Sequence, residues 1–424
     1  MKEEATKRAQ ELDSIDSLSP FRSLFHFPQK DGKDCIYLCG NSLGLQPRNT
    51  SSFINEELKN WQERGVEGHF TGDKPWVSYH KNAKPSLAKI VGAQENEVVA
   101  MNNLTTNLHL AMASFYQPKG KRTKILIERG AFPSDFYAVY SRIENSGFDP
   151  NENLIELEPA DGSDYLSTEE IVSKISELGD ELALVMFPGV QYYTGQFFNI
   201  KSITEAAHAV GAKAGFDLAH AVGNVPLQLH AHDVDFAVWC TYKYLNSGPG
   251  GVGGLFIHQR HGENKELTRL SGWWGHEAEG RFKMDNEINP IPTVDGWQLS
   301  NVNILSHASH LASLKLFDEA GIVKLRDKSI KLTDFMEELI LNSEVLKGQV
   351  KIITPSKHAE RGAQLSVFLI NHGKSVFEFL VNQGVILDWR EPNVIRVAPV
   401  PLYNSFSDAV KFVTILEEAI LHEG

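Results

Sequence analysis

Short apolar runs alternate with segments of helical periodicity between about residues 85 and 260, and this alternation restricts the possible folds more than any other feature. The apolar runs include KILIE, LALVMF, AKAGFDL and VDFAVWC, and the helical patterns include TTNLHLAMASFY, PSDFYAVYSRIEN and SITEAAHAVG. Strands that alternate with helices form a mainly parallel sheet, because each helix carries the chain back to begin the next strand in the same direction. We therefore expect an α/β domain whose sheet is covered by helices on both faces.

The chain of 424 residues is long enough for this domain and a smaller one. After about residue 305 the pattern changes to long amphipathic stretches, SHLASLKLFDEAG and KSIKLTDFMEELILNS, followed by strand-like VKIITP, LSVFLI and NVIRVAP. The first part of the chain contains little that could form a core of its own. We expect an N-terminal segment over residues 1–70 that packs on both domains, a large domain over 71–305 and a smaller α+β domain over 306–424.

The net charge of −13, from 41 Lys and Arg against 54 Asp and Glu, argues against nucleic-acid and membrane-surface partners. A small anionic ligand would need local positive charge. The three cysteines, Cys35, Cys39 and Cys240, are too scattered for a disulfide framework, which predicts a cytoplasmic protein. The charged opening residues lack the apolar core of a signal peptide, and no apolar run approaches the ~20 residues that span a bilayer.

Tyr242 and Lys243 follow an apolar run, residues 234–239, that has the character of a buried strand. They therefore lie at its carboxyl end, where open α/β sheets bind ligands. A lysine there can form a Schiff base with a carbonyl cofactor, although most loop lysines are simply solvated. The glycines Gly248, Gly250 and Gly253 satisfy GxGxxG, but strand-like LFIH follows them instead of a helix. We reject a dinucleotide site and expect these glycines to let the backbone turn tightly beside the lysine.

Two other segments place polar groups at strand ends. Asp217 ends the run AKAGFD, where it could hold a pyridine nitrogen protonated or, equally, cap a following helix. His220, close behind it, could hydrogen-bond a cofactor or be an ordinary packed histidine. Leu104 and Thr105 begin a helical pattern after a strand, and the free amides at a helix start favour phosphate. Ordinary Thr and Asn capping explains the same pattern.

Two weaker motifs remain open or are rejected. The run His230-Ala231-His232-Asp233 could suggest a metal, but two histidines at i, i+2 spacing without a convergent third ligand are usually polar loop residues, so we predict no metal. The adjacent Trp273 and Trp274 in GWWGH suit either the core or an exposed turn that presents its rings.

Together these segments resemble the kynureninase family, which consists of pyridoxal-phosphate (PLP) enzymes of the aminotransferase superfamily, fold type I. The resemblance runs in order from about residue 36 to residue 405, through YLCGNSLGLQP, AFPSD, GVQYYTGQFFNI, GFDLAHAVGNVPL, YKYLNSGPGGVGG, GWWGH and IRVAPVPLYNSF. It implies a mainly parallel, seven-stranded sheet in the large domain. It also implies a hydrolase acting on carbon–carbon bonds in ketonic substances, which cleaves the Cβ–Cγ bond of kynurenine or 3-hydroxykynurenine to give an anthranilate and alanine. Such an enzyme takes part in tryptophan catabolism or NAD biosynthesis.

The resemblance also implies roles for single residues. Lys243 would carry PLP as a Schiff base and move the proton at Cα, Asp217 would pair with the pyridinium nitrogen, and Tyr242 would serve as an acid. Further cofactor contacts would come from Leu104, Thr105, Phe132, Pro133, Ser134, Asp135, Pro188, His220, Tyr242, Trp273 and Asn301. Substrate contacts would come from Ser42, His69, Trp274, Asn301 and Arg396. Arg396 would clamp the α-carboxylate, and a homodimer is implied because a second subunit would complete the phosphate end of the site.

The resemblance says less about whether the substrate ring carries a hydroxyl group. His69, Ser300 and Asn301 resemble the animal enzymes, which favour 3-hydroxykynurenine, more than the bacterial type. Trp274 and Pro188 depart from the animal pattern, which has Phe and Ser there, and neither change removes a catalytic group.

Two rival functions make different demands on the sequence. A cysteine desulfurase on the same fold needs a nucleophilic cysteine in the C-terminal part, and none follows Cys240. A non-catalytic homologue would have lost Lys243 or Arg396, and both are present. The residues therefore favour the kynureninase-type enzyme.

Overall fold

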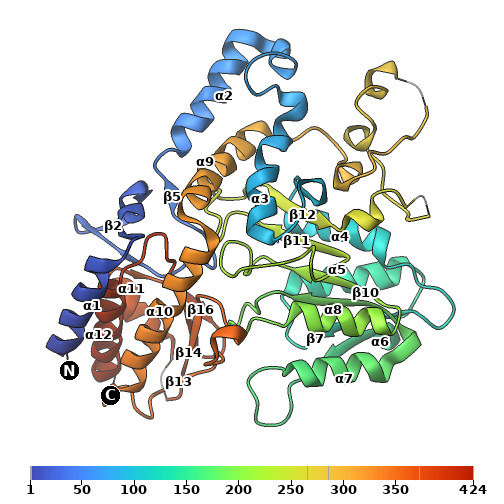
Figure 1. Ribbon diagram of the computed structural model, residues 1–424. Coiled ribbons are helices and arrows are strands. Elements are labelled where there is room, and N and C mark those ends of the chain that lie inside the picture. The colour runs from blue at the N-terminus through green and yellow to red at the C-terminus, as the bar shows by residue number, and fades with distance from the viewer. Residues whose placement is uncertain (1, 265, 285, 372, 424) are drawn as a thin grey trace.

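A seven-stranded sheet organises the larger part of the chain (Figure 1). The computed structural model describes residues 2–264, 266–284, 286–371 and 373–423. In sheet order the strands are β6 (Val98–Ala100), β12 (Gly253–Ile257), β11 (Phe236–Cys240), β10 (Lys213–Asp217), β9 (Leu182–Pro188), β7 (Lys124–Glu128) and β8 (Leu154–Leu157). Only β12 runs antiparallel to its neighbours, so the expected mainly parallel sheet is confirmed.

Successive residues of the central strands enter two separate cores, one on each face of the sheet. In β11, Phe236 and Val238 pack on one side, whereas Ala237 and Trp239 pack on the other. Such strands are apolar throughout because both faces are covered. One face is covered by α4 (Leu104–Phe115) and α5 (Pro133–Asn145), and the other by α3 (Lys84–Val91), α7 (Thr168–Leu178) and α8 (Ile200–Ala209). The short helix α6 (Pro150–Asn153) precedes β8.

The C-terminal part contains a second sheet with helices packed on it. Its antiparallel sheet has the order β13 (Val350–Ile352), β14 (Leu365–Leu369), β17 (Val394–Val397) and β16 (Asp388–Arg390). Its helices are α10 (Ile322–Leu341), α11 (Lys374–Asn382) and α12 (Phe406–Glu423). They bury an apolar core of their own, separate from the two cores of the large sheet.

The N-terminal segment packs on both units. Its first helix, α1 (Lys2–Ile15), lies against α12 and contributes Ala9 to the small core, whereas Phe25 joins a core of the large sheet. Its short strands are β1 (Phe25–His26) paired with β5 (Gln46–Pro47), β2 (Gln29–Lys30) paired with β3 (Lys33–Asp34), and β4 (Ile36–Tyr37) paired with β15 (Val385–Ile386). These strands are too short to stand alone, so the segment depends on both units for its structure.

Two long helices, α2 (Thr50–Arg64) and α9 (Ile304–Ala320), lie side by side (Figure 1). Phe317 of α9 packs into a core of the large sheet. The division of the chain near residue 305 stays a prediction. Within the described residues, no helix is long and apolar enough to cross a membrane.

Candidate active site

A cavity of about 220 Å³ lies at the carboxyl ends of β7, β9, β10 and β11, beside the small domain. It is lined by Asn41, Ser42, Leu104, Thr105, Glu128, Phe132, Ser134, Asp135, Pro188, Val190, Tyr192, Asp217, Ala219, His220, Tyr242, Lys243, Arg390 and Arg396. Parallel strands end at one edge of a sheet, so residues far apart in the chain meet there. Most of the residues predicted to contact a cofactor line this one cavity.

Lys243 extends into the cavity from the loop after β11. Its Nζ lies 3.1 Å from Nε2 of His220 and 5.8 Å from the centre of the Phe132 ring. Burial, followed by the positive charge of Lys243, lowers the pKa of His220 well below its usual range. The imidazole is therefore neutral, and its Nε2 accepts a hydrogen bond from the lysine amine. Its other nitrogen, Nδ1, is buried without a partner among the described residues, so it is free to donate to a ligand.

Three buried carboxyl groups line the same cavity. Burial raises the pKa of Asp217, although Lys243 opposes the shift, and burial together with Asp217 raises the pKa of Asp135 well above its usual range. Asp135 is therefore protonated and donates a hydrogen bond to Asp217. Burial raises the pKa of Glu128 in the same way. The cavity thus holds one site, at Asp217, where a cationic group of a ligand would be stabilised.

The alternative role of Asp217, capping a helix, is only partly correct. Its Oδ1 accepts a hydrogen bond from the backbone N–H of Ala219 at 2.7 Å, but residues 219–224 form turns instead of a helix. This local bond fixes the carboxylate in an orientation that lets it line the cavity.

The start of α4 forms another wall of the cavity. Asn103 caps the helix, with its Oδ1 accepting from the backbone N–H of Thr106 at 3.0 Å, so the ordinary capping explanation holds. Leu104 and Thr105, in the first turn, also line the cavity, as a phosphate-binding helix start requires. A capped helix still presents its remaining amides, so the predicted phosphate contact is compatible with the cap and stays a prediction.

The glycines after Lys243 act as expected. Gly248 and Gly250 have φ values of +96° and +65°, which side-chain-bearing residues rarely adopt. A Cβ on Gly253 would lie 2.8 Å from the backbone carbon of Asn103, so this glycine lets β12 approach the start of α4. The strand β12 begins at Gly253, where a dinucleotide fingerprint would require a helix, and the rejection of that motif is confirmed.

Arg396 on β17 supplies positive charge at the small-domain side of the cavity. The side chain is 1% exposed, and its Nη1 donates to the backbone oxygen of Tyr192 at 2.8 Å. Its Nη2 donates to Ser42 Oγ at 3.1 Å and to the carboxylate of Asp388. A guanidinium fixed by several acceptors can bind a carboxylate with little loss of side-chain entropy.

Several predicted site residues do not line this cavity. Pro133 begins α5 next to the lining residues, whereas the half-buried His69 and the exposed Asn301 lie outside it. Of the two adjacent tryptophans, Trp273 is 47% exposed and Trp274 is buried, so only one presents its ring to solvent. The contacts predicted for these residues stay predictions.

Sequence reasoning missed other lining residues. Glu128 ends the strand KILIE at the same edge as Asp217, so the strand-end argument that found Asp217 could have found it. Tyr192 comes from a loop within the segment GVQYYTGQFFNI, which indicated the family but gave Tyr192 no role, and Arg390 comes from the small domain, where no local pattern marks it.

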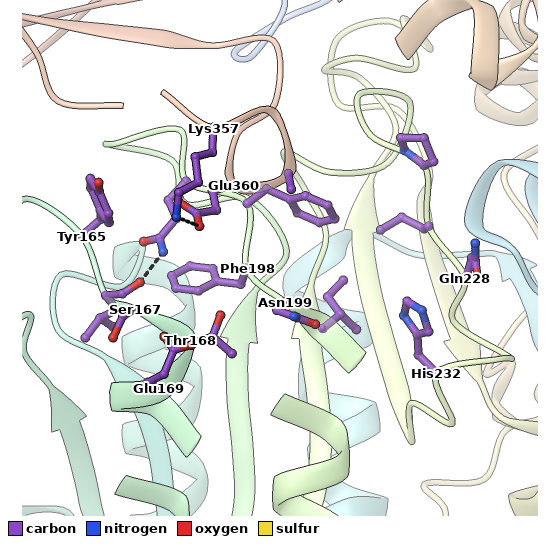
Figure 2. A pocket seen from close by; sticks show the side chains of 17 residues that line it. Tyr165, Ser167, Thr168, Glu169, Phe198, Asn199, Gln228, His232, Lys357 and Glu360 are labelled. Atoms are coloured by element: carbon purple, nitrogen blue, oxygen red, sulfur yellow. Dashed lines mark hydrogen bonds and ion pairs between the residues drawn. The ribbon is translucent and has the colours of Figure 1, made fainter. Parts of the chain in front are cut away.

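A larger cavity, of about 520 Å³, contains none of these residues (Figure 2). It lies where α7 and α8 begin, and both helices are already capped, by Ser167 and Asn199 respectively. Its lysine, Lys357, pairs with Glu360 at 2.9 Å. Polar groups that satisfy one another do not mark a catalytic centre, so volume is a poor guide to the site here.

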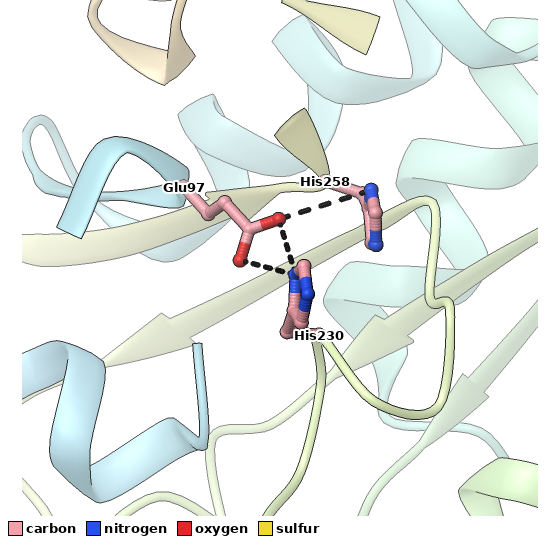
Figure 3. Close-up of side chains that lie close together, drawn as sticks. All are labelled: Glu97, His230 and His258. Atoms are coloured by element: carbon pink, nitrogen blue, oxygen red, sulfur yellow. Dashed lines mark hydrogen bonds and ion pairs between the residues drawn. The ribbon is translucent and has the colours of Figure 1, made fainter. Parts of the chain in front are cut away.

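Glu97, His230 and His258 form the one group, among the residues that the structure describes, close enough to chelate a metal ion (Figure 3). The Glu97 carboxylate already accepts backbone hydrogen bonds from Gln94 and Gln259, each at 2.9 Å. Nδ1 of His230 lies 2.9 Å from the same carboxylate. Three donors satisfy this carboxylate without a metal, and the expected absence of one stays a prediction.

The architecture defines the class of protein. A cysteine desulfurase from Thermococcus onnurineus matches with a TM-score of 0.73 at 17% identity, over 92% of this chain and 95% of its own. A cysteine desulfurase from Escherichia coli matches with a TM-score of 0.75 at 15% identity, over 96% and 99%. At these identities the likeness concerns the fold alone, which is that of the PLP-dependent enzymes of fold type I.

Sequence comparison is more specific. A family model described as the kynureninase C-terminal domain matches residues 325–416. Kynureninase from Flavobacterium psychrophilum is 51% identical over 97% of this chain and 97% of its own length, and kynureninase from Myxococcus xanthus is 49% identical over 98% and 97%. The chain belongs to the kynureninase family.

The protonated state of Asp135 predicts how cofactor-free protein responds to pH. The pKa of this carboxyl is raised in the folded protein. The folded state therefore keeps a proton that the unfolded state releases, and stability falls as pH rises above about 4. We expect the free energy of unfolding of Asp135→Asn, relative to wild type, to increase with pH by up to about 1.4 kcal/mol per unit.

Urea unfolding at several pH values measures this difference. Ser134→Ala, in the same cavity, does not titrate and should change the stability equally at every pH. A pH-independent difference for Asp135→Asn would mean that Asp135 is ionised in the folded protein.

Proposed function

We propose that this protein is a kynureninase with PLP as its cofactor, which hydrolyses kynurenine or 3-hydroxykynurenine to the corresponding anthranilate and alanine in tryptophan catabolism. The observation that carries the proposal is the meeting of Lys243, Asp217 and Arg396 in one cavity. Relatives of about half-identical sequence over nearly the whole chain bear the name kynureninase. A solved neighbour, with a TM-score of 0.73 at 18% identity over 90% of this chain and 96% of its own, has glycine covalently linked to its PLP cofactor.

The residues of the cavity fit this cofactor group by group. Lys243 offers an amine to its aldehyde, Asp217 a carboxylate to its ring nitrogen, and Thr105 at the start of α4 a donor to its phosphate. Phe132 offers a ring face, and the unpaired Nδ1 of His220 offers a further donor. When bound, PLP supplies the electron sink that stabilises negative charge at the substrate Cα.

The acid–base groups of the chain then divide the proton transfers. The Lys243 amine takes and returns the proton at Cα, and the neutral His220 accepts a hydrogen bond from that amine. Asp135 donates to Asp217 and so orients its carboxylate. Burial, with Cys240 nearby, raises the pKa of Tyr242 above its usual range, so the phenol stays protonated and can deliver a proton to Cβ.

The other end of the cavity holds the amino-acid part of the substrate. Arg396 and Ser42 bind the α-carboxylate, which places Cα beside the Lys243 amine. The cysteine desulfurases share the fold, but the absence of any cysteine after Cys240 in the sequence disfavours their chemistry.

Lys243→Ala tests the assignment of the central residue. Wild-type protein should show a visible absorption band from bound PLP and should form anthranilate from kynurenine, followed by its fluorescence. The variant should lose the band of the lysine-bound cofactor and should lose at least about 10³-fold in kcat, because the amine moves the proton. Lys357→Ala, at the other cavity, should keep both properties. A wild-type protein that binds PLP but releases neither anthranilate product would exclude the kynureninase assignment.

We further propose that the preferred substrate is 3-hydroxykynurenine, with His69 and Asn301 as hydrogen-bond partners of the ring hydroxyl. We expect a higher kcat/KM for the hydroxylated substrate, and we expect His69→Phe to reduce that preference by about tenfold, the value of one hydrogen bond. Steady-state kinetics on both substrates measure the ratio. Equal or better kcat/KM on plain kynurenine in wild type would contradict the proposal.

We also propose a homodimer, and an exposed aromatic group supports it. The ring of Phe282 contacts those of Phe70 and Trp273 at centroid distances of 5.9 and 5.4 Å, and Phe282 is 54% exposed. Met284 beside it in the sequence is 75% exposed. Clustered apolar side chains on the surface of one chain are typical of an interface. The proposed positions of Trp273 and Asn301 at the active site of a second subunit require such an interface.

Light scattering should give a mass of twice that of one chain. Phe282→Asp should shift the protein toward the monomer, because a charge would be buried at the interface, and should lower PLP affinity since the site is then incomplete. Ile15→Asp, which is also exposed but lies on α1, should leave the dimer intact. A monomeric wild type that binds PLP and is fully active would overturn this proposal.

A further inference from the structure

Three charged side chains lie on one face of the small-domain sheet, beside the cavity. The register pairs Asp388 of β16 with Arg396 of β17, and Arg390 follows Asp388 by two residues on the same strand. Side chains two residues apart in a strand point to the same face. Arg390 and Arg396 therefore lie on the same side of this sheet as Asp388, and both line the cavity that contains Lys243.

One oxygen of Asp388 holds both arginines. Its Oδ2 accepts from Nη2 of Arg396 and, at 3.2 Å, from Nη2 of Arg390. The same oxygen accepts from the hydroxyl of Ser42. Two guanidinium groups share a single carboxylate here, so this corner of the cavity carries one uncompensated positive charge before any substrate binds.

Each guanidinium keeps an unused donor. The Nε atoms of Arg390 and Arg396 are buried without a hydrogen-bond partner among the described residues. A buried donor without an acceptor is costly, and an incoming carboxylate could satisfy both. The Arg390 side chain is 38% exposed, compared with 1% for Arg396, so it lies nearer the opening of the cavity. Its charge also reaches the interior, because it contributes with Arg396 to the lowered pKa of His220.

We propose that Arg390 is a second binding residue for the α-carboxylate of the substrate, and that Asp388 positions both guanidinium groups for it. This inference rests on the proposed function, in which Arg396 binds that carboxylate. A carboxylate has two oxygens, and two guanidinium groups can bind both of them. The surplus positive charge favours an amino acid over its amide, so Arg390 contributes to specificity as well as to affinity.

A purely structural pairing of Arg390 with Asp388 makes a different prediction. Loss of Arg390 would then act only through Asp388 and Arg396, and Arg390→Lys, whose ammonium can still pair with Asp388, would keep the wild-type preference for L-alanine over L-alaninamide. Direct binding requires that this preference fall in Arg390→Lys as well as in Arg390→Gln. L-alanine, the proposed amino-acid product, and L-alaninamide differ in the carboxylate, so their dissociation constants measure the preference.

The experiment measures the dissociation constants of L-alanine and L-alaninamide for PLP-loaded wild type and Arg390→Gln. We expect the preference for L-alanine over its amide to fall about tenfold in the variant, the value of one charge-assisted hydrogen bond. The KM for kynurenine should rise by a similar factor, with kcat within about twofold, because the contact is equal in ground and transition states. Arg8→Gln, which removes an exposed pair with Glu338, should change none of these values.

Arg390→Lys provides a second variant if Arg390→Gln fails to fold or to bind PLP. It keeps the charge but loses the planar fork, so the preference should fall by about threefold. A preference for L-alanine that is unchanged in Arg390→Lys, whatever Arg390→Gln shows, or an equal loss for both ligands, would overturn the role of Arg390. A wild type without kynurenine hydrolysis would instead overturn the proposed function, and the two failures are therefore distinguishable.

Discussion

The electrostatic balance around the buried amine of Lys243 is the constraint on which the cavity depends. His220 is neutral because it is buried next to that amine, and the same amine opposes the rise in the pKa of Asp217. Asp135 is protonated because two adjacent buried carboxylates cannot both ionise. Each group therefore has its protonation state set by its neighbours. A lysine elsewhere at this sheet edge would leave the acids without a counter-charge.

The cavity has two ends of opposite character, and the fold explains why. The Asp217 carboxylate ends a strand of the large sheet, whereas Arg390 and Arg396 lie on strands of the small domain. A substrate with a cationic centre and an anionic carboxylate fits between them. The N-terminal segment closes the arrangement, since the N–H of Gly44 donates to the oxygen of Tyr242 at 2.8 Å and leaves no room for a larger residue there.

The fold of this protein is shared more widely than its sequence. Cysteine desulfurases share the fold at TM-scores of 0.73 and 0.75 with only 17% and 15% identity, whereas kynureninases share about half of the sequence. A backbone of this kind positions a lysine and an aspartate at a sheet edge, and the side chains around them select the reaction. In this chain no cysteine follows Cys240, and Arg390 and Arg396 line the cavity that contains Lys243.

The sequence by itself determined the mainly parallel sheet with helices on both faces, because the periodicity of apolar strands and amphipathic helices is visible in the local sequence. It also determined the positions of Lys243, Asp217 and the start of α4, since strand ends are local features and parallel strands end at one edge. Only the tertiary structure decided that Asp135 is protonated beside Asp217, that Tyr192 contacts Arg396, and that Arg390 lies beside the same cavity. These contacts join residues from different loops and domains, and their protonation depends on burial, which no local pattern encodes.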